Sequence, residues 1–325
     1  MRVIRSLASG EAAGEAAGVP AGKGTVVTIG NFDGVHLGHQ AILRQVVARS
    51  RELNLVPAVL TFEPHPAKVL APGRAPLLIN TTAQKLRRLE QAGAATVLLC
   101  PFSPEFAQLS PEEFADRVLR QTLNARVVMT GEDFRFGHRQ SGDIVRLREL
   151  GAQLGFAVEA VADIDAGQRS SGQRISSTGI RALITEGKVS QACRLMGAPF
   201  TLEGAVVSGF GIGKKQTVPT LNLAAENELL PQYGVYVTRT RPDGGAPVAS
   251  ITNVGMRPTF DGSAVTVETF LLSDGPVSAP ARLEVEFLGW VRAERKFASP
   301  EALRAQILRD VGSARRFHRH FPGRA

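Results

Sequence analysis

The chain has 325 residues, of which 43 % are hydrophobic and 21 % charged, and its formal net charge is +8. This length favours two domains, and the composition is ordinary for a globular protein, so a basic surface that attracts anions is the first hint of function. The two cysteines are too few for a disulfide framework, and no apolar run is long enough to span a membrane. We therefore expect a cytoplasmic protein without a signal peptide.

The N-terminal half alternates between strand and helix patterns. Residues 1–7 are predicted to form a short strand, and the Ala/Gly/Glu-rich residues 8–24 a flexible insertion. Apolar β-branched runs predict strands at 24–30, 56–62, 95–102, 125–131 and 156–163, and helical spacing predicts helices at 39–53, 81–93, 110–123 and 141–155. This alternation is typical of βαβ units with a mainly parallel sheet, a Rossmann-like α/β domain whose ligands bind at the carboxyl ends of the strands.

The pattern changes after residue 186. A helix is predicted at 187–197, and short strands separated by Gly/Pro turns at 200–209, 233–240, 247–255, 265–272 and 281–289. Such strands indicate a small antiparallel β barrel, followed by a terminal helix at 299–317. We interpret the basic tail at 314–321 as a solvated helix face. The sequence thus predicts domains at 1–186 and 187–325.

The stretch "GNFDGVHLGH" (30–39) joins a buried strand to a helix. A helix N-terminus attracts phosphate because its backbone N–H groups point outward and its dipole favours an anion. Two histidines, His36 and His39, add donors for phosphate oxygens. Donors positioned in this way can stabilise charge on the α-phosphate during nucleotidyl transfer. The motif is not a P-loop, which would require Gly-Lys-Ser/Thr.

Three further stretches lie where such a domain would bind a nucleotide: "TFEPHP" (61–66), "GEDFRFGHRQSGD" (131–143) and "ISSTGIR" (175–181). In the first, Phe62 and His65 can face a planar ring; in the second, Phe134 and Phe136 offer stacking at a strand end. In the third, hydroxyls at a helix N-terminus and Arg181 make a second anion site. The plain alternatives are a rigid loop, a small apolar cluster and an N-cap.

Two stretches of the C-terminal half carry further candidate chemistry. "GAVVSGFGIGKKQTVPTLNL" (204–223) is a strand followed by a glycine-rich loop with two lysines, and the oxygens of Thr220 and Asn222 suit Mg²⁺. "VTVETFLL" (265–272) places Glu268 on the same strand face as Phe270 and Leu272. A carboxylate in this position fits a general base for a substrate hydroxyl, or an exposed strand edge.

Taken together, these stretches resemble one family across nearly the whole chain. "HLGH" looks like the His-x-Gly-His signature of the nucleotidylyltransferases, a superfamily that includes class I aminoacyl-tRNA synthetases. The wider string, with "TFEPHP", "GEDFRFG" and "ISSTGIR", resembles the bacterial bifunctional riboflavin kinase/FMN adenylyltransferases. "PTLN", "VET", "ITNVGMRPTF" and "VRAERKF" resemble the riboflavin kinase module of that family.

The resemblance implies two reactions, with ATP as co-substrate of both: riboflavin to FMN with Mg²⁺, and FMN to FAD with release of pyrophosphate. His36, His39 and Glu268 are its implied catalytic residues. The implied ATP contacts of the adenylyltransferase are Gly30, Asn31, Phe32, Asp33, Gly34, His36, His39, Ser176, Ser177, Thr178 and Arg181, and its flavin and nucleotide contacts are Phe62, Pro64, His65, Asp133, Phe134 and Phe136. The implied ATP contacts of the kinase are Gly209, Gly211, Gly213, Lys214, Lys215, Thr220 and Asn222, the last two with Mg²⁺.

The chain departs from the family at "GKKQTV" (213–218), where the family has Gly-Arg-x-Leu-Gly-Phe. Lys214 keeps the charge of arginine but not its bidentate fork, and Thr217 replaces a glycine. The alternatives are a cytidylyltransferase-like enzyme with an unrelated barrel, and a nucleic-acid-binding protein. We see no aromatic-interleaved basic surface for nucleic acid and infer no obligate protein partner, so riboflavin, FMN, FAD and ATP are the expected ligands. A tRNA synthetase fits less well, because "ISST" stands where that class has lysines.

Overall fold

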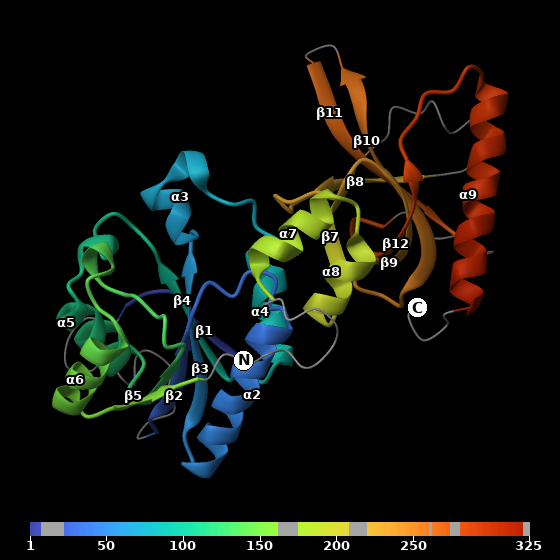
Figure 1. Cartoon of the computed structure of the whole chain (residues 1–325). Helices are drawn as coiled ribbons and strands as arrows, with labels where there is room; N and C mark the ends of the chain where they lie inside the picture. The colour runs from blue at the N-terminus through green and yellow to red at the C-terminus, as the bar shows by residue number, and fades with distance from the viewer. Residues whose placement is uncertain (8–22, 162–174, 208–219, 260–261, 274–279, 321–325) are drawn as a thin grey trace. The chain divides into compact units, whose positions relative to one another are not determined.

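The computed structural model describes residues 1–7, 23–161, 175–207, 220–259, 262–273 and 280–320 (Figure 1). The chain forms two compact units: the first comprises Met1–Leu77 and Thr82–Ile175, and the second Leu78–Thr81 and Ser176–Ala325. The second unit therefore begins about ten residues earlier than the boundary expected at 186. The insertion expected at 8–24 lies almost wholly outside the described residues.

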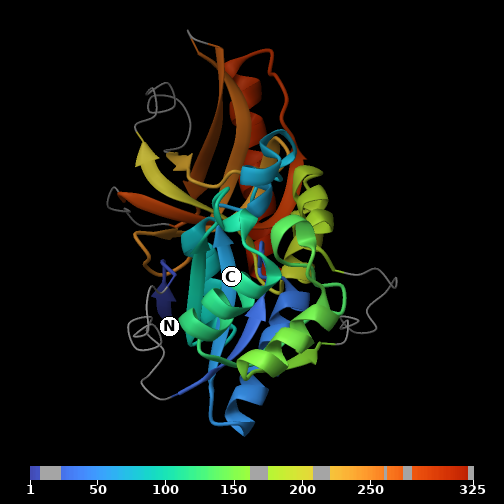
Figure 2. The ribbon, with the colours of Figure 1, turned by 90° about the vertical axis from the view of Figure 1, so that its left-hand side faces the viewer.

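The first unit is built on a six-stranded parallel sheet in the order β1-β4-β3-β2-β5-β6. Figure 2 shows its first strand, drawn in dark blue beside the label N. Its strands are β1 (Arg2–Ile4), β2 (Thr25–Ile29), β3 (Val56–Glu63), β4 (Thr96–Pro101), β5 (Ala125–Thr130) and β6 (Ala157–Ala160). All six were predicted from sequence. Because β2 lies between β3 and β5, the loops that follow these three strands leave the same edge of the sheet side by side.

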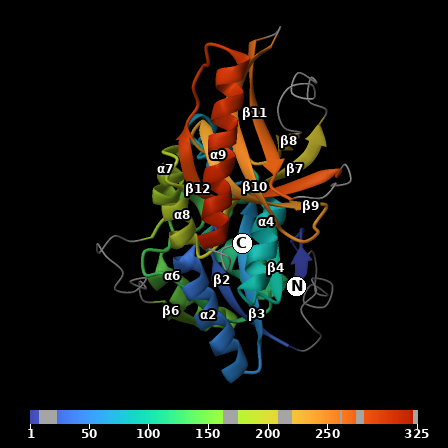
Figure 3. The same ribbon diagram turned by 90° about the vertical axis from the view of Figure 1, so that its right-hand side faces the viewer.

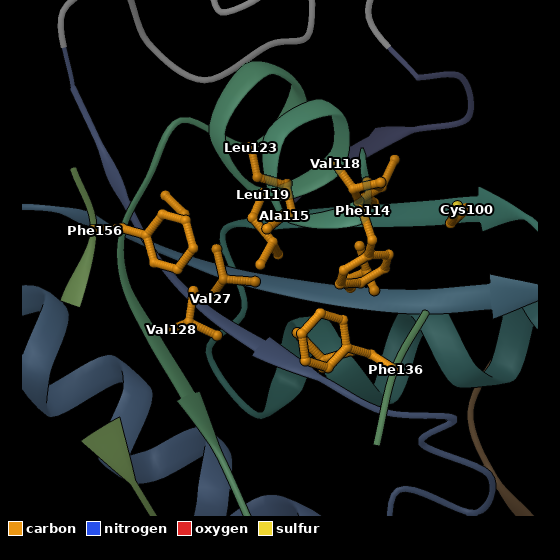
Figure 4. Packing of buried hydrophobic residues seen from close by; sticks show 14 of the residues in the cluster. Val27, Cys100, Phe114, Ala115, Val118, Leu119, Leu123, Val128, Phe136 and Phe156 are labelled. Atoms are coloured by element: carbon orange, nitrogen blue, oxygen red, sulfur yellow. The ribbon is translucent and has the colours of Figure 1, made fainter. Parts of the chain in front are cut away.

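Helices cover both faces of this sheet. On one face, α2 (Leu37–Glu52) and α4 (Thr82–Gln91) bury Leu43 and Leu89 against β3 and β4. On the other, η3 (Phe114–Thr122) and α6 (Ile144–Leu154) enclose the larger core cluster, which Figure 4 shows, and α5 (Pro111–Glu113) leads into η3. Short segments connect these layers: α3 (Pro66–Leu70), η1 (Pro72–Arg74), η2 (Phe106–Gln108) and η4 (His138–Gln140).

The helix expected at 110–123 differs from the prediction in its second part. Ser110 caps it in a reciprocal capping box with Glu113, as its sequence indicates. After Glu113 the hydrogen bonds widen to a five-residue spacing, and the N–H of Leu123 donates to the carbonyl of Val118 at 3.1 Å. The wider turn aligns Phe114, Val118 and Leu123 on one face, and all three are buried in the core.

The second unit contains a closed antiparallel barrel in the order β10-β11-β8-β7-β12-β9. Its strands are β7 (Phe200–Val207), β8 (Leu221–Ala225), β9 (Gly234–Pro242), β10 (Val248–Thr259), β11 (Gly262–Leu271) and β12 (Arg282–Ala293). The helices α7 (Ser177–Thr185) and α8 (Val189–Met196) precede the barrel. Strand β8 was missed from sequence, because its residues were interpreted as the end of a loop motif.

The barrel interior is packed with side chains. Tyr236, Phe200 and Phe287 are fully buried and in edge or tilted ring contact. Beside them runs a chain of five buried hydroxyls, defined here as the hydroxyl chain, with O···O distances of 2.8–2.9 Å in the order Thr240, Ser250, Thr238, Thr252 and Thr269. Buried side chains therefore fill this stretch of the lumen.

The terminal helix α9 (Pro300–His320) lies against the outside of the barrel (Figure 3). Ser299 caps it by accepting from the N–H of Ala302 at 3.2 Å. Ala314 is buried against Ile251 of β10, and Phe317 packs on the same cluster. The expectation of a solvated face at 314–321 thus holds for the exposed arginines of this stretch and is wrong for its apolar residues.

Two glycine substitutions in the second unit are expected to change its stability in opposite directions. A Cβ on Gly204 of β7 would lie 1.9 Å from the carbonyl oxygen of Ala224, so Gly204→Ala should lower the free energy of unfolding by up to about 3 kcal/mol. A Cβ on Gly312 of α9 has no atom nearer than 3.7 Å, so Gly312→Ala should raise it by roughly 0.5–1 kcal/mol.

Urea unfolding of both variants can be followed by tryptophan fluorescence, because the one tryptophan of the chain, Trp290, lies in β12 and contacts Tyr236. An unchanged midpoint for Gly204→Ala would contradict the close approach of β7 and β8.

Candidate functional site

The strand order of the first unit brings together three of the loops singled out from sequence. Residues 30–36 follow β2, residues 64–65 follow β3, and residues 131–136 follow β5. These strands are neighbours in the sheet, with β2 in the middle. A ligand bound at this edge would therefore meet the histidine loop at its centre and an aromatic loop on each side.

The histidine loop ends in a capped helix N-terminus. His36 is the N-cap of α2, and its Nδ1 accepts a hydrogen bond from the backbone N–H of His39 at 3.4 Å. The proton of neutral His36 is therefore placed on Nε2. The two imidazole rings are stacked, with centroids 3.7 Å apart and planes 17° apart. A Cβ on Gly38 would lie 3.2 Å from the His36 ring, which accounts for the small residue between the histidines.

The stacked pair favours uncharged imidazoles. Burial, and then the neighbouring His36, hold the pKa of His39 well below its usual value. The Nδ1 atom of His39 has no hydrogen-bond partner among the described residues. A neutral imidazole carries one N–H donor and no positive charge, so any phosphate at this loop would meet His39 as a hydrogen-bond donor rather than as a cation.

The backbone before α2 turns sharply to reach the helix. Phe32, Gly34 and Val35 have φ values of 49°, 81° and 40°, a region that side chains other than glycine rarely adopt. Phe32 is 2 % exposed, and its ring lies 5.0 Å from that of His39. Buried contacts therefore hold this loop in a strained conformation, as occurs at binding sites.

A row of phenylalanines links the two flanking loops. Successive ring centroids lie 5.4–6.2 Å apart from Phe62 through Phe102, Phe106, Phe114 and Phe136 to Phe134. Phe134 is stacked on Phe136 at 9° between planes, and Phe136 is buried in the core. The buried ring of Phe136 thus holds the ring of Phe134 in place. Contact of Phe134 or Phe136 with a flavin stays a prediction.

The polar residues of the flanking loops have local roles in the structure. His65 is the N-cap of α3, and its Nδ1 accepts from the N–H of Ala67 at 3.1 Å, which is a capping role beside the predicted flavin contact. Pro64 precedes it and Asp133 is exposed. Arg135 forms an exposed ion pair with Asp143 at 3.2 Å, so its charge is partly neutralised.

Lys85 of α4 is a buried polar residue that the sequence analysis did not single out. It is 8 % exposed, and its Nζ lies 3.4 Å from Thr61 Oγ1 and 3.3 Å from the carbonyl oxygen of Phe62. The available signal was its position four residues before the buried Leu89, on the helix face toward the sheet.

The "ISSTGIR" stretch begins α7 in the second unit. Ser176 is its N-cap and accepts from the N–H of Gly179 at 3.2 Å. Arg181 lies one turn on, with Nη1 3.4 Å from Thr178 Oγ1. The approach of Ser176, Ser177, Thr178 and Arg181 to the phosphates of ATP stays a prediction.

Strand register places the candidate residues of the barrel in one row. Asn222 of β8 is directly opposite Glu268 of β11, and Asn253 of β10 is opposite Glu268 on its other side. Opposed residues of antiparallel strands point to the same face, so these three half-buried side chains share the outside of the barrel. Phe270 lies on the same face and packs toward α9. Asn253 was quoted within "ITNVGMRPTF" but given no role, and only the register reveals it.

The remaining kinase candidates lie outside the described residues, apart from Thr220, which is exposed just before β8. They are Gly209, Gly211, Gly213, Lys214 and Lys215. The departures at 213–218, including Thr217, lie in the same part of the chain. Searched over the described residues, no group of three or more His, Cys, Asp or Glu side chains could hold a metal.

Comparison with known proteins agrees with both halves of the geometry. The FAD synthetase family model matches residues 19–179, and the riboflavin kinase model matches residues 196–318. A bifunctional riboflavin kinase/FMN adenylyltransferase of Escherichia coli (strain K12) is 35 % identical over 295 residues, covering 91 % of this chain and 93 % of that protein. The chain belongs to the bifunctional riboflavin kinase/FMN adenylyltransferase family.

Other members of this riboflavin kinase/FMN adenylyltransferase family are similarly related. Those of Haemophilus influenzae and Pseudomonas fluorescens are 34 % and 36 % identical, each covering 91 % of this chain and 94 % of the relative. A crystal structure described as a macrolide-efflux protein from Streptococcus pneumoniae superposes with a TM-score of 0.82 at 27 % identity, covering 97 % of this chain and 99 % of that one. Across the described residues, no helix has the length and apolarity needed to cross a membrane.

The lowered pKa of His39 predicts a specific acid sensitivity of the first unit. In the unfolded chain this histidine takes up a proton near pH 6.5, whereas the folded state resists protonation, so stability should fall as the pH drops below about 6.5, by up to about 1.4 kcal/mol per pH unit. His39→Gln should lose less stability than wild type between pH 7.5 and pH 5. Calorimetric unfolding at both pH values measures the difference, with His138→Gln as the control for loss of one histidine. Equal acid sensitivity of wild type and His39→Gln would refute the buried neutral state.

Proposed function

We propose that the two activities of this family are divided between the two units of this chain. Membership of the family gives the chain riboflavin kinase and FMN adenylyltransferase activity, and both use ATP. The observation that carries the division is that the FAD synthetase match lies almost wholly in the first unit and the riboflavin kinase match in the second. Cytoplasmic location remains an expectation from sequence.

In the adenylyl transfer, a phosphate oxygen of FMN attacks the α-phosphorus of ATP. The new P–O bond forms as the bond to the bridging oxygen of the β-phosphate breaks, and pyrophosphate leaves with that electron pair. No protein nucleophile is needed, so the work of the site is positioning and charge stabilisation. The stacked rings of His36 and His39 at the N-terminus of α2 supply neutral donors for oxygens of the α-phosphate, and the helix N-terminus adds its dipole.

The two loops beside the histidines fit the flavin end of FMN and the nucleotide. Phe62 and Phe134 stand at the ends of the phenylalanine row, and both are only partly buried. Offset stacking on a planar ring suits such half-exposed aromatic side chains.

In the kinase reaction, Glu268 accepts the proton of a ribityl hydroxyl of riboflavin while that oxygen attacks the γ-phosphorus of ATP and ADP leaves. The support is its place between Asn222 and Asn253, on the strand face that it shares with Thr266, Phe270 and Leu272. Asn222, directly opposite this carboxylate, and Thr220, just before β8, offer neutral oxygens that fit Mg²⁺. When bound there, Mg²⁺ would neutralise charge on the ATP phosphates.

Substitution at each site should block one step and spare the other. In a mixture of riboflavin, ATP and Mg²⁺, wild type should form FMN and then FAD. His39→Ala should lower FAD formation by on the order of 100-fold while FMN accumulates. Glu268→Ala should lower FMN formation by on the order of 100-fold or more, yet convert added FMN to FAD at the wild-type rate. Chromatographic separation of the flavins measures all three compounds.

The reaction that each variant retains shows that this variant is folded. Loss of both reactions in either variant would contradict the division between units. Absence of both products with wild type would contradict the function itself, and a preference for CTP over ATP would point to a different nucleotidyltransferase.

A further inference from the structure

Lys85 links α4 to the end of β3 and, through Thr61, to the histidine loop. Its Nζ lies within 3.4 Å of Thr61 Oγ1 and 3.3 Å of the carbonyl oxygen of Phe62, both near the end of β3. The hydroxyl of Thr61 in turn donates to the carbonyl of Asn31 at 3.0 Å, within the histidine loop. The chain of contacts therefore runs from α4 through β3 to the loop that follows β2.

Two carboxylates also act on the charge of this lysine. Asp33, from the histidine loop, is 5 % exposed, and Glu63 is the last residue of β3. Both favour the charged form of Lys85 and act against the burial that lowers its pKa, and burial is the larger influence. Glu63 is held from the other side by the hydroxyl of Thr82, the first residue of α4.

Burying a lysine side chain here costs free energy, because its ammonium group loses contact with water. Lysine is almost never this buried without partners, and an apolar side chain would fill the space under the sheet edge without desolvating a cation. The partners of Lys85 are backbone and side-chain oxygens of Thr61 and Phe62, with Asp33 and Glu63 close enough to act on its charge. Its ammonium group thus contacts the end of β3, from which the Pro64–His65 loop continues.

We propose that Lys85 is a positioning residue for adenylyl transfer, which fixes the histidine loop relative to the end of β3 at Thr61 and Phe62. The proposal rests on the function proposed above for the first unit. Its effect on the reaction passes through the position of Asp33 and of the Phe62 backbone, and Lys85 itself need not touch FMN or ATP.

The test compares Lys85→Met with wild type in the conversion of FMN to FAD. Met is similar in length and lacks the charge and the donors, so kcat/KM should fall by on the order of 100-fold, the loss expected when reacting groups are misplaced by about 1 Å. Phosphorylation of riboflavin by the same variant should stay within twofold of wild type. Arg87→Met, which removes a charge from the exposed side of α4, is the matched control and should leave both reactions unchanged.

A pH profile separates this role from simple loss of packing. Wild-type kcat/KM for adenylyl transfer should decline at alkaline pH as Lys85 loses its proton, at a pH below the usual lysine range. Lys85→Arg, which stays charged, should be more active than Lys85→Met and lack this decline. Calorimetry establishes whether Lys85→Met is folded, and if it is not, the profile of Lys85→Arg decides.

The proposal would be overturned if kcat/KM still declined at alkaline pH in a folded Lys85→Arg variant. It would also be overturned if Lys85→Met converted FMN to FAD at the wild-type rate. Wild type that forms no FAD would instead overturn the function on which it rests.

Discussion

The position of β2 between β3 and β5 is the constraint from which the first unit's site follows. In a parallel sheet all strands end at the same edge, so loops that are far apart in sequence become neighbours once the strand order is set. Residues near 33, 63 and 133 are thereby brought to one place. The helix that follows β2 then adds an N-terminus at that place without further design.

Buried polar groups distinguish this edge of the sheet from an ordinary set of connecting turns. Stacked imidazoles and a desolvated ammonium group are unfavourable in a core. The imidazole pair is stabilised by the capping hydrogen bond of His36, and the ammonium group by the oxygens around Lys85. Strained backbone at Phe32 and Val35 adds to the cost. The apolar layers on both faces of the sheet offset this cost. The polar groups of the candidate site therefore lie at the edge of the sheet, and the stabilising core lies in the layers.

Sequence reasoning succeeded where a signal is local and periodic. The alternation of strands and helices predicted the parallel sheet, and period-2 spacing placed Glu268 on the face of Phe270, as the register confirms. It failed where the deciding interaction is distant in sequence. Short β8 has a register only because β11 and β7 pair with it, and Lys85 appears as one more helix residue until β3 is packed beneath it.

The wide turns of η3 were also not predicted from sequence, for the same reason. Four-residue and five-residue spacings both bury Phe114 and Val118, and the choice between them depends on the core they meet.

The hydroxyl chain in the barrel has a consequence of its own. Each hydroxyl donates one proton and each of the four contacts needs one donor, so four of the five hydroxyls donate within the chain and the fifth has its proton left for an acceptor outside it. The position of this fifth hydroxyl sets the direction in which the protons of the others point. A methyl group in place of the central hydroxyl, that of Thr238, would divide the chain into two independent pieces, whereas the same change at Thr240 or Thr269 would only shorten it.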